Sequence, residues 1–174
     1  MPSRDAKSSA AFGFYTVVEQ PQIGLLGGYL VVNAAGRPLE FHCTAPVKPT
    51  RAQTILFGAT LEPYLYGEHI GQALIRKAET LATVICTDRP QALAVRQYID
   101  APVALIVGEE ASIRTSIATP SFTIGTVRLA VAGGFTGDES LVAERIALFA
   151  ASMPLAEPFE RIRQAIDEAQ RGER

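Results

Sequence analysis

Glu40 and His42 are the first residues in this sequence whose types and spacing suit catalysis. They alternate with apolar side chains in residues 38–44, which predicts a strand with both groups on one face and Cys43 on the other. A carboxylate can orient a neighbouring histidine as a general base near neutral pH. Residues two apart on a strand are neighbours in any pleated sheet, however, so a hydrogen-bonded strand surface is the favoured interpretation.

A second set of polar groups follows two predicted strands. Asp88 comes after the apolar residues 83–87, and Glu109 and Glu110 come after residues 103–107. If these strands are parallel, the carboxylates meet at one carboxyl edge, where open α/β sheets place ligand sites. Asp88 also suits the N-cap of a following helix, and paired glutamates are ordinary in a loop.

One interpretation joins these groups into the site of an enzyme that acts on a small molecule. His42 is then the base, Glu40 its orienting group, and Asp88 or Arg51 lies at the pocket. This hypothesis requires residues far apart in the chain to converge in space.

Tyr64, Tyr66, Glu68 and His69 lie in the first turns of a predicted amphipathic helix. The helix begins at Pro63, and apolar residues recur at helical spacing for about five turns. Aromatic and charged side chains at a helix start can form a recognition surface for a partner or a small ligand. Local packing of single aromatic residues is the favoured alternative.

A glycine-rich segment, residues 133–137, lies between a predicted strand and a predicted helix. The backbone amides of Gly133 and Gly134 beside a helix N-terminus could hold a phosphate. The segment lacks the endings of a P-loop and of a dinucleotide-binding fingerprint. Asp138 and Glu139 also place negative charge where a phosphate would lie, so a structural turn is favoured.

The histidines and cysteines do not have the spacing of a metal site. The sequence contains two of each, and Cys43 and Cys86 lie in apolar segments that predict buried, reduced thiols. A carboxylate site for magnesium stays open. We expect no metal ion and no cofactor.

The hydrophobic pattern predicts an antiparallel meander at the start of the chain. Its strands are expected at residues 13–19, 23–33 and 38–44, with a tight turn at residues 33–36. Glycine inside a strand commonly marks a bulge or a place where another backbone comes close, which is the expectation for the pair at positions 27 and 28.

The rest of the chain alternates strands and helices. The order strand, helix, strand over residues 83–107 predicts a parallel pair, and residues 122–132 predict one long strand. Thr136 and Glu139 match a capping box that starts a helix. Residues 157–171 predict an amphipathic terminal helix.

These elements predict an α+β fold in which the antiparallel meander continues into a mixed sheet covered by three to four helices. The 174 residues are enough for one ordinary domain with a real core. Residues 1–11 are expected to form a flexible tail, and residues 12–174 a single domain.

Composition and charge narrow the function. Hydrophobic residues make up 48% and charged residues 20% of the chain, a proportion that predicts an apolar surface covered by a partner. The net charge of −2 and the absence of a dense basic run argue against nucleic acid, and no apolar segment is long enough to span a membrane. We therefore predict a cytoplasmic, non-catalytic interaction or assembly module that binds a second copy or another protein. The alternative is the small-molecule-binding domain or enzyme described above.

Overall fold

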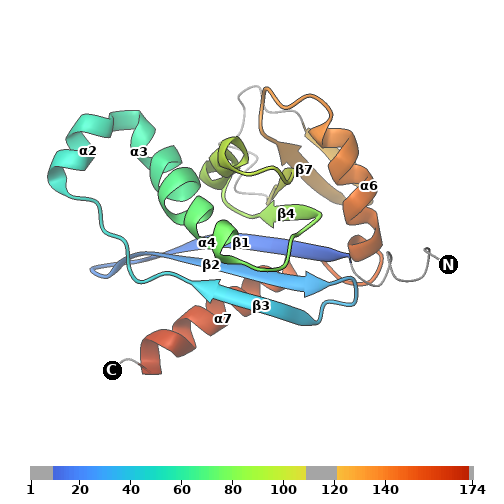
Figure 1. Ribbon diagram of the computed structural model, residues 1–174, viewed down its shortest axis with the longest axis horizontal. Coiled ribbons are helices and arrows are strands. Elements are labelled where there is room, and N and C mark those ends of the chain that lie inside the picture. The colour runs from blue at the N-terminus through green and yellow to red at the C-terminus, as the bar shows by residue number, and fades with distance from the viewer. Residues whose placement is uncertain (1–9, 109–120, 173–174) are drawn as a thin grey trace.

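The computed structural model describes residues 10–108 and 121–172, and their strands form one sheet (Figure 1). The strands are β1 (Ala11–Gln20), β2 (Gly24–Asn33), β3 (Pro38–Cys43), β4 (Val84–Thr87), β5 (Val103–Ile106), β6 (Ser121–Ile124) and β7 (Val127–Val131). Their order in this seven-stranded sheet is β3-β2-β1-β4-β5-β7-β6. All but the last two residues of the expected tail, and also Glu109 and Glu110, lie outside the described residues.

The sheet is mixed. β1, β2 and β3 are antiparallel neighbours, whereas β4 runs parallel to β1 and β5 runs parallel to β4. β7 pairs antiparallel with both β5 and β6. The prediction of an α+β fold, with a meander that continues into a mixed sheet, is therefore confirmed. β2 and β4 are buried along almost their whole length because helices cover both faces of the sheet.

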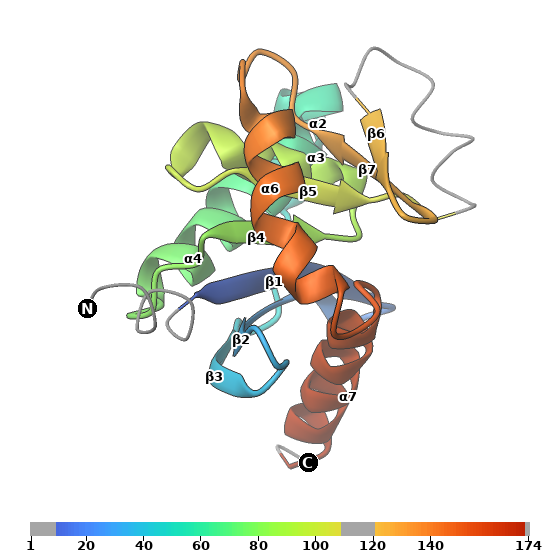
Figure 2. The same cartoon turned by 90° about the vertical axis from the view of Figure 1, so that its right-hand side faces the viewer.

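The helices lie on the two faces of the sheet (Figures 1 and 2). One face carries the run from residue 51 to residue 77, together with η3, and the other face carries α6 and α7. The bounds are α2 (Arg51–Phe57), η1 (Gly58–Thr60), α3 (Leu61–Pro63), η2 (Tyr64–Gln72), α4 (Ala73–Lys77), η3 (Pro90–Tyr98), α6 (Asp138–Ala150) and α7 (Glu157–Gly172). η2 is a π-helix, and η1 and η3 are 3-10 helices.

The two glycines inside β2 allow helices to approach the sheet closely from both sides. A Cβ atom at Gly27 would overlap Ile70 of η2, and a Cβ atom at Gly28 would overlap Ile162 of α7. The ladder between β1 and β2 continues through both residues without interruption. Neither expectation for this pair is met as stated, because the ladder to β1 has no bulge there and the atoms that come close are helix side chains and not another backbone.

Aromatic side chains fill the core under α6 and α7. Phe14 of β1 lies 5.1 Å from Phe149 and 5.5 Å from Phe159, measured between ring centroids, and Phe12 lies 5.4 Å from Phe149. Tilted pairs of this kind contribute about 0.5–1.5 kcal/mol each beyond the burial of their apolar surface. They fix both helices to the same strand.

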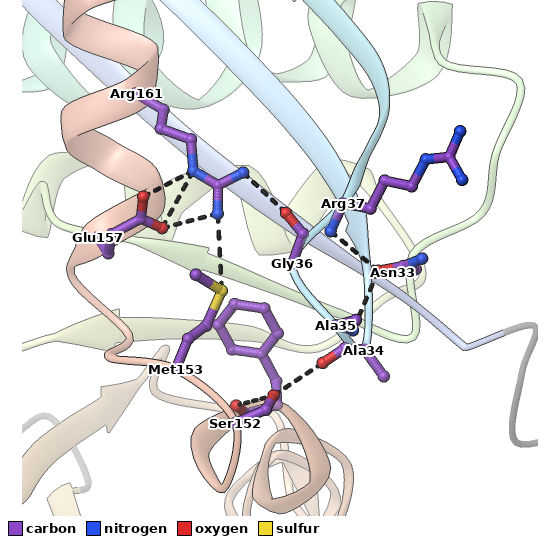
Figure 3. A network of polar contacts seen from close by, with 10 residues as sticks. Asn33, Ala34, Ala35, Gly36, Arg37, Ser152, Met153, Glu157 and Arg161 are labelled. Atoms are coloured by element: carbon purple, nitrogen blue, oxygen red, sulfur yellow. Dashed lines mark hydrogen bonds and ion pairs between the residues drawn. The ribbon is translucent and has the colours of Figure 1, made fainter.

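The start of α7 also holds the turn between β2 and β3 (Figure 3). Arg161 donates a hydrogen bond of 2.8 Å to the carbonyl of Gly36 and pairs at 2.7 Å with Glu157. Ser152 donates a bond of 2.8 Å to the carbonyl of Ala34. The meander and the C-terminal helix are thus tied together at this end of the sheet.

The helix expected from Pro63 to about residue 81 differs at both ends. It begins at Leu61 and ends at Lys77, because Ala78 takes an extended conformation with ψ 135°. Leu81, expected on the apolar face, is 88% exposed. Residues 51–58, for which helix and strand stayed open, form α2 and the start of η1, and α2 begins with a complete capping box between Thr50 and Gln53.

Two further expectations were wrong in detail. Residues 122–132 form a hairpin of β6 and β7 and not one strand, because the chain turns at Gly125 with φ 62°. The N-cap of α6 is Gly137, with φ 96° and no side-chain cap bond, and not Thr136. The terminal helix lies where the sequence predicts it. In the described part of the chain, no helix is both long enough and apolar enough to cross a membrane.

The glycine pair in β2 leads to a test of stability. Gly28→Ala should lower the free energy of unfolding by about 1–3 kcal/mol, because its methyl group overlaps α7. In a chain of this size this corresponds to a loss of roughly 2–4 °C in Tm for each kcal/mol, measured by thermal unfolding. Gly133→Ala is the matched control, since no atom lies within 4 Å of its Cβ position. Equal Tm values for the two variants would contradict the close approach of α7.

Candidate functional site

The carboxyl end of β4 and the adjoining middle of β1 bring together a hydroxyl, a carboxylate and a guanidinium group. Thr16 donates a hydrogen bond of 2.5 Å from Oγ1 to Oδ1 of Asp88, and Arg163 of α7 forms an ion pair with Oδ2 of Asp88. Thr16 is fully buried, whereas the side chains of Asp88 and Arg163 are 19% and 38% exposed. We call these three residues the edge site.

The register of the sheet explains this meeting. Tyr15 of β1 lies opposite Thr87 of β4, so Thr16 and Asp88 are the next residues of two parallel strands. Thr16 lies opposite Gly28, the residue on which α7 packs, and therefore faces that helix. Because Ile162 fits against Gly28, the next residue, Arg163, reaches the carboxylate.

Arg89 connects the end of β4 to β1 beside the edge site. Its amide donates to Oγ1 of Thr87 at 3.2 Å, and its Nε donates to the carbonyl of Val17 at 3.0 Å. These bonds satisfy a backbone carbonyl at the end of β1 and hold a second guanidinium group at the same edge.

A cavity of about 390 Å³ opens farther along β1, at its carboxyl end and on the opposite face of the sheet. The turn between β1 and β2, the segment before α2 and the start of the long helical run line it: Glu19, Gln20, Pro21, Gln22, Gly24, Leu25, Val47, Lys48, Pro49, Leu61, Glu62, Leu65 and Tyr66. Burial raises the pKa of Tyr66, and the nearby charge of Arg89 partly opposes that shift. Charged side chains thus lie on both faces here, with Asp88 and Arg163 on one and Glu19, Lys48 and Glu62 around the cavity on the other.

The structure does not bring His42 and Glu40 to Asp88. β3 is separated from β4 by two strands, which is about 14 Å at ordinary strand spacing. His42 lies opposite Tyr29 and so shares the face covered by η2, whereas Asp88 binds a residue of α7 on the other face. The predicted grouping of these three residues is therefore wrong, because the alternation along β3 turns His42 away from that face.

Glu40 has a structural environment. It accepts hydrogen bonds from the backbone amides of Glu79 at 3.0 Å and Thr80 at 2.6 Å, and it lies 3.4 Å from Nε2 of His42. The amide of Glu79, followed by that of Thr80, lowers the pKa of Glu40 to about 2. This carboxylate holds the chain where it leaves α4.

The other predicted ligand residues are spread over two regions. Arg51 is exposed at the start of α2. Tyr64 stacks on Phe57 with 4.5 Å between ring centroids, and His69 lies 5.9 Å from Tyr64. Glu68 accepts a hydrogen bond of 3.3 Å from the hydroxyl of Tyr98. Tyr66, in contrast, is buried, and its carbonyl accepts a bond of 2.5 Å from Tyr15.

Gly133 and Gly134 form an exposed turn before α6. Asp138, the first residue of α6, is 3% exposed and binds Arg96 through two hydrogen bonds of 2.7 and 3.3 Å. The guanidinium carbon of Arg96 also lies 4.2 Å from the ring centroid of Phe135. The positive end of this helix is thus occupied by a carboxylate of the chain itself, which supports the structural interpretation of the glycine segment.

Sequence reasoning missed Thr16 and Arg163. Thr16 is a hydroxyl residue inside an otherwise apolar strand, and that exception is the signal that could have identified it. Arg163 adjoins Ile162 of the apolar stripe on α7, but the pattern assigned it to the charged outer face. Within residues 10–108 and 121–172, no group of three His, Cys, Asp or Glu side chains could hold a metal ion.

Comparison with known proteins identifies a fold. No protein-family model and no curated protein sequence matches the chain. Among solved structures, it is similar to a variant of Endonuclease V from Ciona intestinalis in complex with a 23mer DNA that contains an inosine followed by a ribo-adenosine. The TM-score is 0.52 at 9% identity, over 91% of this chain and 86% of that chain. At this identity, the likeness shows the fold alone.

This finding contradicts the function predicted from the sequence. One solved structure with this fold is an endonuclease bound to DNA. The prediction of a non-catalytic interaction or assembly module, with a protein partner and no nucleic acid, was therefore wrong. The sequence argument required a dense basic run, but Arg89 and Arg163 reach one edge from distant parts of the chain.

Removal of the Thr16 hydroxyl tests the geometry of the edge site. Thr16→Val keeps the shape of the side chain but leaves Oδ1 of Asp88 without this donor, so unfolding should become easier by about 1.5–3 kcal/mol. Urea denaturation measures the difference. Thr123→Val, at an exposed threonine of β6, is the control and should stay within about 0.5 kcal/mol of the parent protein.

The environment of Glu40 predicts a dependence of stability on pH. Its pKa is lowered from 4.5 to about 2 in the folded protein, so its contribution is complete above pH 4.5 and is lost as the pH falls toward 2. Glu40→Gln should be less stable at neutral pH and should lose less stability between these pH values. Unfolding midpoints across the acid range test this, with exposed Glu168→Gln as the control. Identical pH profiles for the parent protein and Glu40→Gln would refute the assignment.

Proposed function

We propose that this protein binds nucleic acid across the carboxyl edge of β1 and β4, with Arg163 in contact with a backbone phosphate. The observation that carries the proposal is the fold likeness to a DNA-bound endonuclease over 91% of the chain. The position of the edge site supports it, because sheets with parallel strands place ligand sites beyond the carboxyl ends of those strands. A guanidinium group 38% exposed at that edge suits a phosphate.

Asp88 serves in this proposal as the anchor of Arg163. One carboxylate oxygen accepts the Thr16 hydroxyl and the other pairs with the guanidinium group, so the side chain of Arg163 is held in one orientation. Nη1 of Arg163 also lies 3.8 Å from the exposed carboxylate of Glu160. A guanidinium group has five N–H donors, and those that face neither carboxylate can bind a phosphate oxygen. The carboxylate thereby reduces the entropy that Arg163 loses on binding.

The charge of the chain sets the expected strength of binding. With a net charge of −2 and cations such as Arg89, Arg163 and Lys48 near the edge, only a few phosphates are neutralised. Each phosphate contact with duplex DNA contributes about −0.9 to the slope of log K against log salt concentration. We expect a slope of roughly −1 to −3 and binding that weakens moderately with salt.

The cytoplasmic location belongs to this proposal as well. Cys43 and Cys86 are free thiols, the usual state of cysteine in reducing compartments. Cys86 is buried as expected, whereas Cys43 is exposed, so the expectation of burial was wrong for that residue. Burial raises the pKa of Cys86 to about 12, which keeps this thiol protonated and unreactive.

Loss of the guanidinium group at position 163 tests the proposal. Arg163→Gln should weaken DNA binding about tenfold near 50 mM salt and reduce the salt slope by about 1, because one phosphate contact is lost. Fluorescence anisotropy with labelled single-stranded and duplex DNA measures both effects. Arg171→Gln, at an exposed position on the same helix, is the matched control and should bind like the parent protein.

Two outcomes would overturn the proposal. Parent protein that binds no DNA or RNA at low salt refutes nucleic-acid binding. An unchanged affinity and salt slope for Arg163→Gln, with the fold confirmed by thermal unfolding, refutes the edge as the binding surface.

A further inference from the structure

The π-helix η2 carries an aromatic hollow on the outside of the molecule. Phe57 and Tyr64 stack with 4.5 Å between centroids and 26° between ring planes. Both rings are half-buried, and they line a hollow of about 280 Å³ together with residues of η3. The full lining is Phe57, Thr60, Pro63, Tyr64, Glu68, Ala94, Gln97 and Tyr98, and we call this feature the aromatic hollow.

Close packing of two helices creates the hollow. Gly67 and Gly71 of η2 leave no room for a Cβ atom beside Ala94 and Val95 of η3, so the helix backbones nearly touch there. This contact turns Leu65 and Tyr66 into the core and leaves Tyr64 and Glu68 outside. π-Helical segments are rare and frequently lie at functional sites.

Polar groups surround the rings. The carboxylate of Glu68 accepts a hydrogen bond of 3.3 Å from the hydroxyl of Tyr98, and the amide side chain of Gln97 is exposed at the same rim. A ligand that fits this lining has a flat apolar face and an edge of hydrogen-bond donors and acceptors. A nucleobase has both, whereas the aromatic ring of a phenylalanine side chain offers no polar edge.

The aromatic hollow adjoins the edge of the sheet at which nucleic acid is proposed to bind. Leu61 and Glu62 line the edge cavity, and Pro63 and Tyr64, the next two residues, line the hollow. One short segment therefore separates the two concave surfaces. Arg163 lies on the opposite face, whereas the charge of Arg89 acts on Tyr66 in the edge cavity, so a strand that crosses the edge between these two cations continues on the face that carries the hollow.

We propose that the aromatic hollow receives one unpaired base of the bound strand, which stacks on the aromatic pair and hydrogen-bonds to its polar rim. The inference rests on the proposed function and adds a substrate class, namely nucleic acid with an unpaired base. A base inside a duplex is stacked and paired, and so cannot enter a hollow of this kind without leaving the helix. The protein therefore prefers single strands or locally unpaired sites to a perfect duplex.

Binding to strands with and without bases tests the inference. Fluorescence anisotropy compares a labelled oligothymidine with the same strand carrying abasic sites, both titrated with the full chain. The parent protein should bind the strand with bases roughly 5- to 150-fold more tightly, which is the range expected from stacking of one base on an aromatic side chain. Phe57→Ala and Tyr64→Ala should lose most of this difference while binding the abasic strand as before.

The controls separate a stacking effect from a loss of fold or charge. Leu56→Ala removes a side chain that is 83% exposed on the same helix and is absent from the lining of the hollow, so it should retain the difference. Inorganic polyphosphate, a polyanion without bases, should compete equally well against the parent protein and Phe57→Ala.

The outcomes distinguish this inference from the proposed function. Equal affinity of the parent protein for the two strands overturns the base-binding role of the hollow and leaves phosphate binding at the edge intact. A parent protein that binds neither strand overturns both. Because the abasic comparison needs no substitution, an unstable Phe57→Ala variant does not prevent the decision.

Discussion

The close approach of helices to both faces of β2 is the constraint on which the rest of the structure depends. Gly27 and Gly28 are adjacent residues of one strand, and each leaves space for a branched side chain from a different helix. Ile70 places the π-helix on one face, and Ile162 places α7 on the other. Because interiors are close-packed, a single added methyl group on either glycine forces the isoleucine packed there, or the helix that carries it, to shift.

The polar groups at the sheet edge follow from this packing. The helix that lies on Gly28 brings Arg163 to Asp88, and the parallel register of β1 and β4 brings Thr16 to the same carboxylate. On the opposite face, the helix that lies on Gly27 begins beside the edge cavity. The cavity, the ion pair and the aromatic hollow are therefore consequences of one arrangement of helices on one sheet.

The proposed function assigns different roles to the edge and to the aromatic hollow. In it, guanidinium groups at the edge attract phosphates, an interaction that is insensitive to base identity and falls with salt. The aromatic hollow is proposed to stack on a base, an interaction that requires a base to be present but tolerates any of them. Glu40 accepts hydrogen bonds from two backbone amides and Asp138 binds Arg96, and these contacts stabilise the segments after α4 and before α6.

The sequence by itself determined the meander, the parallel pair and the terminal helix, because hydrophobic periodicity and turn residues are local properties of the chain. It also placed Asp88 after a strand and singled out Tyr64 and Glu68. Only the tertiary structure decided that His42 lies on the face covered by η2, away from Asp88, and that Arg163 of α7 reaches Asp88 on the other face. The end of the long helix near Lys77 is likewise accompanied by a long-range contact, in which Glu40 accepts hydrogen bonds from the amides of Glu79 and Thr80. Which side chains meet is set by strand order, register and helix packing, and none of these is written in the spacing of residues along one segment.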